Sequence, residues 1–107
     1  MKRVLFLCGK NQIRSPTAEE IFAGRPGIEV RSAGLDHDAD NRCSTEDVEW
    51  ADLIFVMEKS HKAKLSRDFK AQLKAKVICL NIPDTNYVYM DQRLIERLWK
   101  GVEPHLP

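Results

Sequence analysis

The stretch RVLFLCGKNQIRSPTAEEIFA, residues 3–23, decides the fold of this chain. Its opening segment, Arg3–Cys8, is an apolar run of the length typical of a buried β-strand. After a short loop, the composition of Ser15–Ala23 predicts a helix, with Ser15 as the N-cap residue and Pro16 at the first helical position. A strand, a tight loop and a helix in this order are typical of a parallel sheet with crossover helices.

The rest of the chain repeats this change from short apolar runs to longer amphipathic segments. Further strands are predicted at Gly27–Gly34, Asp52–Met57 and Lys76–Asn81. Helices are predicted from Ser44 to Trp50, with Asp47 completing a capping box, over the segment marked by Leu65, Phe69 and Leu73, and from Leu94 to Val102. The sequence therefore predicts an α/β fold in a single three-layer domain, residues 1–107, in which a four-stranded parallel sheet has helices on both faces. Ligands of such sheets bind beyond the carboxyl ends of the strands, and Cys8 lies at one of these ends.

Length, charge and cysteine content narrow the classes of function. A chain of 107 residues with 43% apolar residues is long enough to build one core. Its net charge of +1 gives no overall attraction to nucleic acid or to an anionic membrane, so we expect neither as a partner. The longest apolar runs, VLFLC and LIFVM, are far too short to cross a bilayer, and the three cysteines have no paired spacing. These features favour a cytoplasmic protein.

The loop from Cys8 to Ser15 has the features of an anion-binding site. A short loop before a helix N-terminus turns backbone N–H groups inward, and the guanidinium of Arg14 can bind the same oxyanion through two hydrogen bonds. The helix dipole and Arg14 also favour the thiolate form of Cys8. Gly9 and Asn11 are the loop residues that most easily adopt a left-handed backbone. A thiolate beneath a bound tetrahedral anion is the arrangement required for phosphoryl transfer to sulfur.

Plainer interpretations of the same residues exist. The spacing C-x5-R is weak evidence by itself, because a buried cysteine at a strand end and a surface arginine would also produce it. Ser15 is explained equally well as a hydrogen-bond partner of the Cys8 sulfur and as a simple helix cap. The strand before the motif, and the Ser-Pro pair and helix after it, favour the anion site.

The segment VLFLCGKNQIRSP resembles the signature of the low-molecular-weight protein tyrosine phosphatases, in which a strand is followed by C-x5-R-S, a proline and a helix. RSAG (31–34) and WADLIFVMEKSH (50–61) are also similar to segments of that family. The resemblance implies strand order 2-1-3-4, Cys8 as the nucleophile that becomes a phosphocysteine, Arg14 as the phosphate clamp, Asn11 as the residue that shapes the loop, and Ser15 as the hydroxyl on the thiolate. The predicted substrate-binding residues of this loop are Gly9, Lys10, Asn11, Gln12, Ile13 and Ser15.

The general acid of that family is an aspartate in a late loop, and the loop NIPDTNYVYMDQ, residues 81–92, contains two candidates. Asp84 matches by position, and would protonate the leaving oxygen and then deprotonate the attacking water. Asp91 precedes the last helix and suits its N-terminus better. Tyr87 and Tyr89 follow Asp84, and their position fits stacking against an aryl phosphate as well as packing in the core. Tyr87 is the one we include among the predicted substrate-binding residues.

The resemblance implies hydrolysis of aryl phosphomonoesters, including protein phosphotyrosine, without a metal or other cofactor. The expected partners are a phosphorylated protein or a small aryl phosphate, with inorganic phosphate or another oxyanion as ligand. The sequence departs from the family pattern at Lys10, where glycine is usual, at Ile13, where a second cysteine is common, and at Thr85, which replaces proline after the acid. Two alternatives stay open: a thiol-dependent arsenate reductase that uses Cys43 or Cys79, and a non-catalytic module that binds phosphate or phosphoproteins.

Three further features have simple interpretations. The segment DHDADN, residues 36–41, opens like a calcium loop but lacks the usual glycine, and is interpreted as a solvated acidic turn. The basic residues of Lys59–Lys76 are interpreted as the solvated face of one helix. His37, His61 and His105 have no metal-ligand spacing and are expected at the surface.

Overall fold

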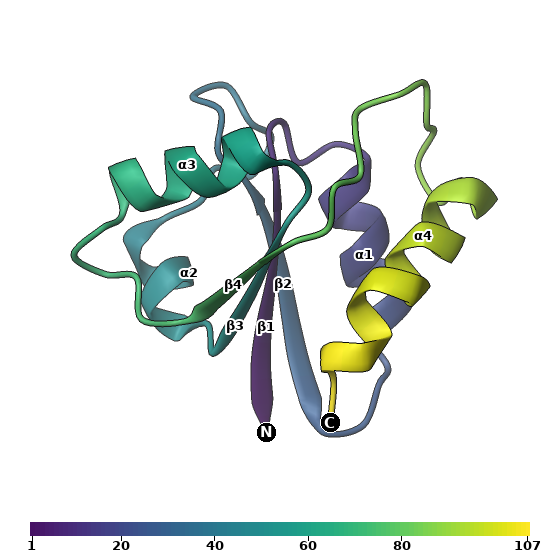
Figure 1. Ribbon diagram of the computed structural model, residues 1–107, viewed down its shortest axis with the longest axis horizontal. Helices are drawn as coiled ribbons and strands as arrows, with labels where there is room; N and C mark the ends of the chain where they lie inside the picture. Colours follow the sequence, from purple (N-terminus) through teal and green to yellow (C-terminus); the bar gives the residue numbers. More distant parts are fainter.

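The computed structural model describes residues 1–107 as one sheet with helices on both faces (Figure 1). In chain order the elements are β1 (Lys2–Cys8), α1 (Arg14–Phe22), β2 (Ile28–Gly34), α2 (Thr45–Trp50), β3 (Leu53–Val56), α3 (Lys59–Asp68), β4 (Lys76–Cys79), α4 (Gln92–Val102) and the short 3-10 helix η1 (Glu103–His105). The four strands lie in the order β2-β1-β3-β4 and all pairs are parallel. The predicted fold class and strand order are confirmed.

The side chains of β1 alternate between the two faces of the sheet, as a strand of period two requires. Val4, Phe6 and Cys8 pack on the face covered by α1 and α4, whereas Leu5 and Leu7 pack on the face covered by α2 and α3 (Figure 1). All five side chains are buried. The sulfur of Cys8 therefore lies on the α1 and α4 side of the sheet.

Two of the predicted helix starts have different outcomes. The capping box of α2 is confirmed, because Asp47 N–H donates to the Ser44 hydroxyl and Ser44 N–H donates to the Asp47 carboxylate. The prediction that Ser15 caps α1 is wrong: the helix begins at Arg14, so that Ser15 and Pro16 are its second and third residues. The hydroxyl of Ser15 is therefore available for another partner.

The helix α3 is shorter than the apolar spacing predicts. It ends at Asp68, and Phe69 and Leu73 lie beyond its end. Both side chains are still partly buried on the α2 and α3 face of the sheet, where Leu65 is fully buried. The apolar spacing thus marks the packing face correctly, although the backbone leaves the helix before the last of these residues.

The loops that follow β1, β2, β3 and β4 meet at one edge of the sheet. The loop after β2 runs beside the loop after β1, with Leu35 N–H donating to Cys8 C=O and Asp36 N–H donating to Gly9 C=O, both at 2.9 Å. Gly34 permits this approach, because a β-carbon at this position would lie 2.5 Å from the carbonyl oxygen of Gly9. None of the helices combines the length and the apolar character needed to span a bilayer.

Candidate active site

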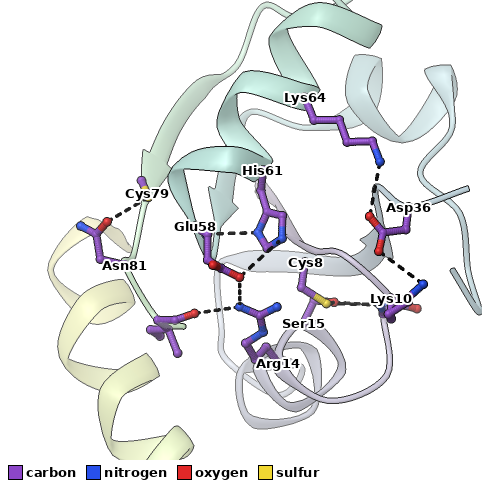
Figure 2. Close-up of polar contacts among 12 residues, drawn as sticks. Cys8, Lys10, Arg14, Ser15, Asp36, Glu58, His61, Lys64, Cys79 and Asn81 are labelled. Carbon is purple, nitrogen blue, oxygen red and sulfur yellow. Dashed lines mark hydrogen bonds and ion pairs between the residues drawn. The ribbon is translucent and has the colours of Figure 1, made fainter. Parts of the chain in front are cut away.

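Cys8 is the last residue of β1 and lies at the base of a cavity of about 360 Å³. Only 3% of the residue is exposed. Its sulfur accepts a hydrogen bond from Asn11 N–H at 3.3 Å and shares a second hydrogen bond with the Ser15 hydroxyl at 2.9 Å (Figure 2). Two donors directed at one sulfur are the contacts that stabilise a thiolate.

A chain of hydrogen bonds behind the loop fixes the direction of the Ser15 proton. The Ser32 hydroxyl donates to the Glu19 carboxylate, so it accepts from the Asn11 side chain, whose Nδ2 lies 3.1 Å away. The same Nδ2 donates to the Ser15 hydroxyl oxygen at 2.9 Å. The proton of Ser15 is then left for the Cys8 sulfur at 2.9 Å or for the Ala33 carbonyl at 3.4 Å, and the closer sulfur is the better acceptor. Asn11 can make both bonds because its backbone is left-handed, with φ of 57°.

The side chain of Arg14 is also fixed by hydrogen bonds. It is the first residue of α1, and only 6% of it is exposed. Its Nη1 donates to Glu58 Oε2 at 2.7 Å and to the Ile82 carbonyl at 2.9 Å. Because both fixed bonds use one nitrogen, Nη2 and Nε remain as donors for an oxyanion in the cavity. The N–H groups of Arg14 and Ser15 have no acceptor within the helix and can serve the same anion.

Of the two late aspartates, Asp84 lines the same cavity as Cys8 and Arg14. Asp91 is the N-cap residue of α4, as predicted, with Oδ1 accepting from Arg93 N–H at 3.0 Å. Hydrogen bonds from the Arg93 side chain hold the pKa of Asp91 well below its usual range. Asp91 therefore caps a helix away from the cavity, and of the two late aspartates only Asp84 lines it.

Glu58 and His61 are site residues that the sequence prediction missed. Both line the cavity, and the expectation that His61 is a surface residue is wrong, since only 8% of it is exposed. The Nδ1 of His61 accepts from Glu58 N–H at 3.1 Å, which ties the start of α3 to the carboxylate that holds Arg14 (Figure 2). Burial, with the Arg14 cation nearby, lowers the pKa of His61. Their position just beyond the carboxyl end of β3 was the available signal.

Comparisons with known proteins identify the fold. A scan against protein-family models finds no match, and a search of curated proteins also finds no match. Among solved structures, the low-molecular-weight protein tyrosine phosphatase SP-PTP from Streptococcus pyogenes has 16% identity and a TM-score of 0.80, over 100% of this chain and 95% of the other. The chain has the fold of the low-molecular-weight protein tyrosine phosphatases.

Two further structures with this fold differ in the substrates that their names give. The YwlE arginine phosphatase from Geobacillus stearothermophilus has 22% identity and a TM-score of 0.73, over 98% of this chain and 95% of the other. The tyrosine phosphatase Wzb from Escherichia coli K30, in complex with phosphate, has 21% identity and a TM-score of 0.73, over 97% of this chain and 95% of the other. The phosphatase fold predicted from the sequence is thus the fold of this chain.

Within this phosphatase fold, the predicted substrate-binding residues fall into three groups. Those that line the cavity are Gly9, Lys10, Gln12 and Ile13. Asn11 and Ser15 lie behind the loop, where they hold the sulfur. Tyr87 is not brought to the cavity: it is buried in the core on the α1 and α4 face, and its hydroxyl accepts from Arg97 at 2.9 Å.

The loop between β1 and α1, residues 9–13, is named the phosphatase loop after the fold, and side chains of the acidic segment after β2 bind to it. Asp36 pairs with Lys10 at 3.6 Å and with Lys64 at 3.3 Å, and Asp38 pairs with Lys10 at 2.6 Å. Asp40 accepts from Gln12 at 3.4 Å. These carboxylates are thus partners of the loop and of α3, and no group of His, Cys, Asp or Glu side chains in the protein is arranged to hold a metal ion.

The other two cysteines lie across the sheet from the site. Cys43 is buried on the α2 and α3 face, and Cys79 packs partly buried on the same face. Burial raises the pKa of the Cys43 thiol to about 12. The sheet separates both thiols from Cys8, and all three cysteines are free.

Proposed function

We propose that the protein is a cysteine-dependent phosphatase that hydrolyses phosphate monoesters through a phosphocysteine at Cys8. One observation supports this most strongly: the Cys8 sulfur, bound by Asn11 N–H and the Ser15 hydroxyl, lies on the same cavity as Arg14 and Asp84. The three side chains come from the end of β1, the start of α1 and the loop after β4. A nucleophile, an anion clamp and an acid are the groups that phosphoryl transfer to sulfur needs.

In the first step, the Cys8 thiolate attacks phosphorus in line with the leaving oxygen. The S–P bond forms as the P–O bond of the ester breaks, and the Asp84 carboxyl group gives its proton to the departing oxygen. The free nitrogens of Arg14 and the loop amides bind the non-reacting oxygens, on which negative charge spreads. The product alcohol or phenol then leaves.

In the second step, water attacks the phosphocysteine. The Asp84 carboxylate takes a proton from the water, the S–P bond breaks, and inorganic phosphate is released. The departing thiolate is stabilised by the bonds from Asn11 N–H and the Ser15 hydroxyl. No metal or other cofactor takes part in either step of this scheme.

For the substrate, we propose a phosphorylated protein or a small aryl phosphate, with phosphotyrosine as the first candidate. The cavity wall favours testing a second candidate. Tyr87 does not reach the cavity. The residues that line the cavity are mostly polar or charged, and they include Gln12, Ser60 and Asp84. Such a wall suits the hydrogen-bonding guanidino group of phosphoarginine, in which a P–N bond would break in place of the ester P–O bond, and one protein of the same fold is an arginine phosphatase. Hydrolysis rates on phosphotyrosine and phosphoarginine peptides of equal sequence will decide between them.

The alternatives fit the geometry less well. An arsenate reductase would have to oxidise Cys8 together with a second cysteine, but Cys43 and Cys79 pack on the opposite face of the sheet. A module that only binds phosphate has no need of Asp84 on the cavity. Because a thiol nucleophile must stay reduced, the proposal includes a cytoplasmic location.

The test of the proposal is hydrolysis of phenyl phosphate by the wild-type protein, Cys8→Ser and Asp84→Asn. We expect Cys8→Ser to abolish turnover, and Asp84→Asn to lower kcat by about 10²- to 10⁴-fold, the usual contribution of a general acid. With p-nitrophenyl phosphate, whose leaving group needs no proton, the loss in Asp84→Asn should be smaller. Asp91→Asn is the matched control, because asparagine keeps the helix cap. Equal rates for the wild-type protein and Cys8→Ser would rule the proposal out.

A further inference from the structure

The positive charge of this nearly neutral chain is concentrated in one segment. Residues 59–76 contain seven lysine or arginine residues and a single acidic residue, Asp68, which gives a net formal charge of +6 against +1 for the whole chain. The segment comprises α3 and the turn that leads to β4. Three of its residues, Ser60, His61 and Lys64, line the cavity of Cys8. The basic segment therefore begins at the candidate active site.

The orientation of α3 separates its lysines into two groups. His61 and Leu65 are buried and mark the face that packs on the sheet. At 100° per residue, Lys64 lies on one edge of that face and Lys62 on the other. Lys64 is half-buried and lines the cavity, whereas Lys62 is exposed and does not. The two lysines are chemically identical but differ in their access to the site.

Lys64 is joined to the phosphatase loop through one carboxylate. Asp36 lies 3.3 Å from the Lys64 ammonium and 3.6 Å from that of Lys10, so it bridges the two across the rim of the cavity (Figure 2). Lys10 has a second partner in Asp38, which does not line the cavity. Two ammonium groups thus share one carboxylate beside a site built for a phosphate group. Lys64 has no carboxylate partner except the one it shares with Lys10, so its ammonium group can pair with a further carboxylate from a ligand.

We propose that Lys10 and Lys64 recognise an acidic side chain adjacent to the phosphorylated residue of a protein substrate. The proposal rests on the proposed function, because the phosphorylated residue itself occupies the cavity above Cys8. The acidic neighbour lies over the rim and binds the lysine pair, with the rest of the basic segment attracting an acidic stretch of the substrate at longer range. Lys10 occupies a position where glycine is usual in the low-molecular-weight protein tyrosine phosphatases. The proposed recognition by Lys10 is therefore specific to this chain.

An acidic peptide suits this rim better than a nucleic acid or a membrane does. A continuous phosphate backbone would meet Asp36 and Asp38 along its length, whereas a single carboxylate can contact the ammonium groups alone. The cavity is also a recess of about 360 Å³, which fits one side chain carrying a phosphate group. A single carboxylate next to that side chain needs only the two ammonium groups at the rim.

The test uses paired phosphotyrosyl peptides that differ only by glutamate or glutamine next to the phosphorylated residue. For the wild-type protein, we expect kcat/KM to be about two- to fivefold higher for the glutamate peptide, the size typical of an exposed charge pair. Lys64→Met should reduce the ratio of the two rates to near one, and Lys64→Glu should invert it. Lys62→Met is the matched control and should keep the wild-type ratio. The preference should also shrink as salt is added.

Several outcomes would overturn the inference. A ratio near one for the wild-type protein, or a ratio lowered equally by Lys64→Met and Lys62→Met, would show that the lysine pair at the rim recognises nothing specific. Binding of duplex DNA or phosphatidylserine vesicles that is lost in Lys64→Met, without any discrimination between the peptides, would assign the surface to another partner. If phenyl phosphate is not hydrolysed at all, the proposed function fails. The same four proteins are then compared for binding of phosphonate analogues of the two peptides. Tighter binding of the glutamate analogue by the wild-type protein and Lys62→Met, but not by Lys64→Met, supports the recognition site. Equal binding of the two analogues by the wild-type protein refutes it.

Discussion

At the scale of single residues, the site depends on hydrogen bonds that fix one sulfur and one guanidinium. The Cys8 sulfur has Asn11 N–H and the Ser15 hydroxyl as donors, and Arg14 has Glu58 and the Ile82 carbonyl as acceptors. No buried side-chain nitrogen or oxygen lacks a hydrogen-bond partner. The polar groups are therefore held in place by other groups of the protein, as electrostatic stabilisation of a transition state requires.

The Ser15 hydroxyl is predicted to matter most when the thiolate leaves the phosphocysteine. Ser15→Ala removes its bond to the sulfur, and a hydrogen bond to a charged group contributes about 1.5–3 kcal/mol. We expect kcat to fall by about 10- to 100-fold, with more phosphoenzyme present during turnover. Steady-state kinetics and rapid-quench measurements check this. An unchanged kcat would mean that Ser15 has only a packing role.

His61 predicts a specific dependence of stability on pH. Its pKa in the folded protein is lowered from the ordinary value of 6.5, so the unfolded chain binds the proton more tightly. The contribution of neutral His61 is present above about pH 6.5 and is lost as the pH falls toward the folded pKa. Protonation of Nδ1 would also remove the acceptor of Glu58 N–H.

Denaturant unfolding at about pH 7.5 and pH 5.5 tests this, since His is the side chain that titrates in this range. The wild-type protein should lose more of its free energy of unfolding on acidification than His61→Gln. His37→Gln, at an exposed histidine, serves as the control and should behave like the wild-type protein. Identical pH dependence in all three proteins would refute the assignment.

At the scale of elements, the phosphatase loop is held between β1 and the segment after β2. Gly34 sits at the closest approach, where a β-carbon would lie 2.5 Å from Gly9 C=O and from Ala39 Cβ. We expect Gly34→Ala to lower the free energy of unfolding by about 1–3 kcal/mol, as overpacking does, and to lower kcat/KM by displacing Gly9.

The matched control for Gly34→Ala is Gly24→Ala. A β-carbon at Gly24 would meet nothing within 4 Å, so stability should change by less than about 0.5 kcal/mol and activity should not change. Urea unfolding and phenyl phosphate kinetics on both variants are the measurements. Equal effects of the two substitutions would show that the close approach at Gly34 does not support the loop.

Sequence patterns predicted the elements well and the helix boundaries less well. Apolar runs located β1, β3 and β4, because a buried parallel strand has a nearly continuous apolar sequence, and the alternating pattern of residues 27–34 located the edge strand β2. The Ser-Pro pair suggested a cap at Ser15, but α1 begins at Arg14, and the Ser15 hydroxyl bonds to the Asn11 side chain and the Cys8 sulfur. For α3, the apolar period continued through Leu73 because the turn after Asp68 packs on the same face.

In the site, residues within local motifs could be predicted from the sequence, whereas residues brought together by long-range contacts could not. Cys8 and Arg14 are six residues apart, so their spacing is visible in the sequence. Asp84 was predicted from its position in the loop of residues 81–92. Glu58 and His61 reach the cavity because β3 lies beside β1 in the sheet, so their contacts with Arg14 join segments far apart in the sequence and do not appear as a local motif. Tyr87 was predicted at the cavity from its closeness to Asp84, but the chain turns between them and buries the ring in the core.

At the scale of the whole molecule, the sheet separates Cys8 from the other thiols. Cys8 packs on the α1 and α4 face, and Cys43 and Cys79 pack on the α2 and α3 face. The Cys43→Ala, Cys79→Ala double variant should therefore keep its phosphatase activity within about twofold, since neither thiol touches the site. Peroxide treatment of the wild-type protein should oxidise Cys8 without forming an intramolecular disulfide, as thiol counting and mass spectrometry will show. A Cys8–Cys43 or Cys8–Cys79 disulfide would contradict the arrangement and support a reductase.

The proposed mechanism requires the Cys8 sulfur to accept the phosphoryl group. The most direct test is to detect a phosphoryl group on Cys8 during turnover. Wild-type protein turning over p-nitrophenyl phosphate is quenched in acid and digested, and its peptides are analysed by mass spectrometry. The mechanism predicts one phosphoryl group, attached to Cys8, that disappears as substrate is exhausted and is absent when Cys8→Ala is treated in the same way. Release of phosphate at the wild-type rate by Cys8→Ala, with no phosphoryl group on Cys8 in the wild-type protein, would contradict it.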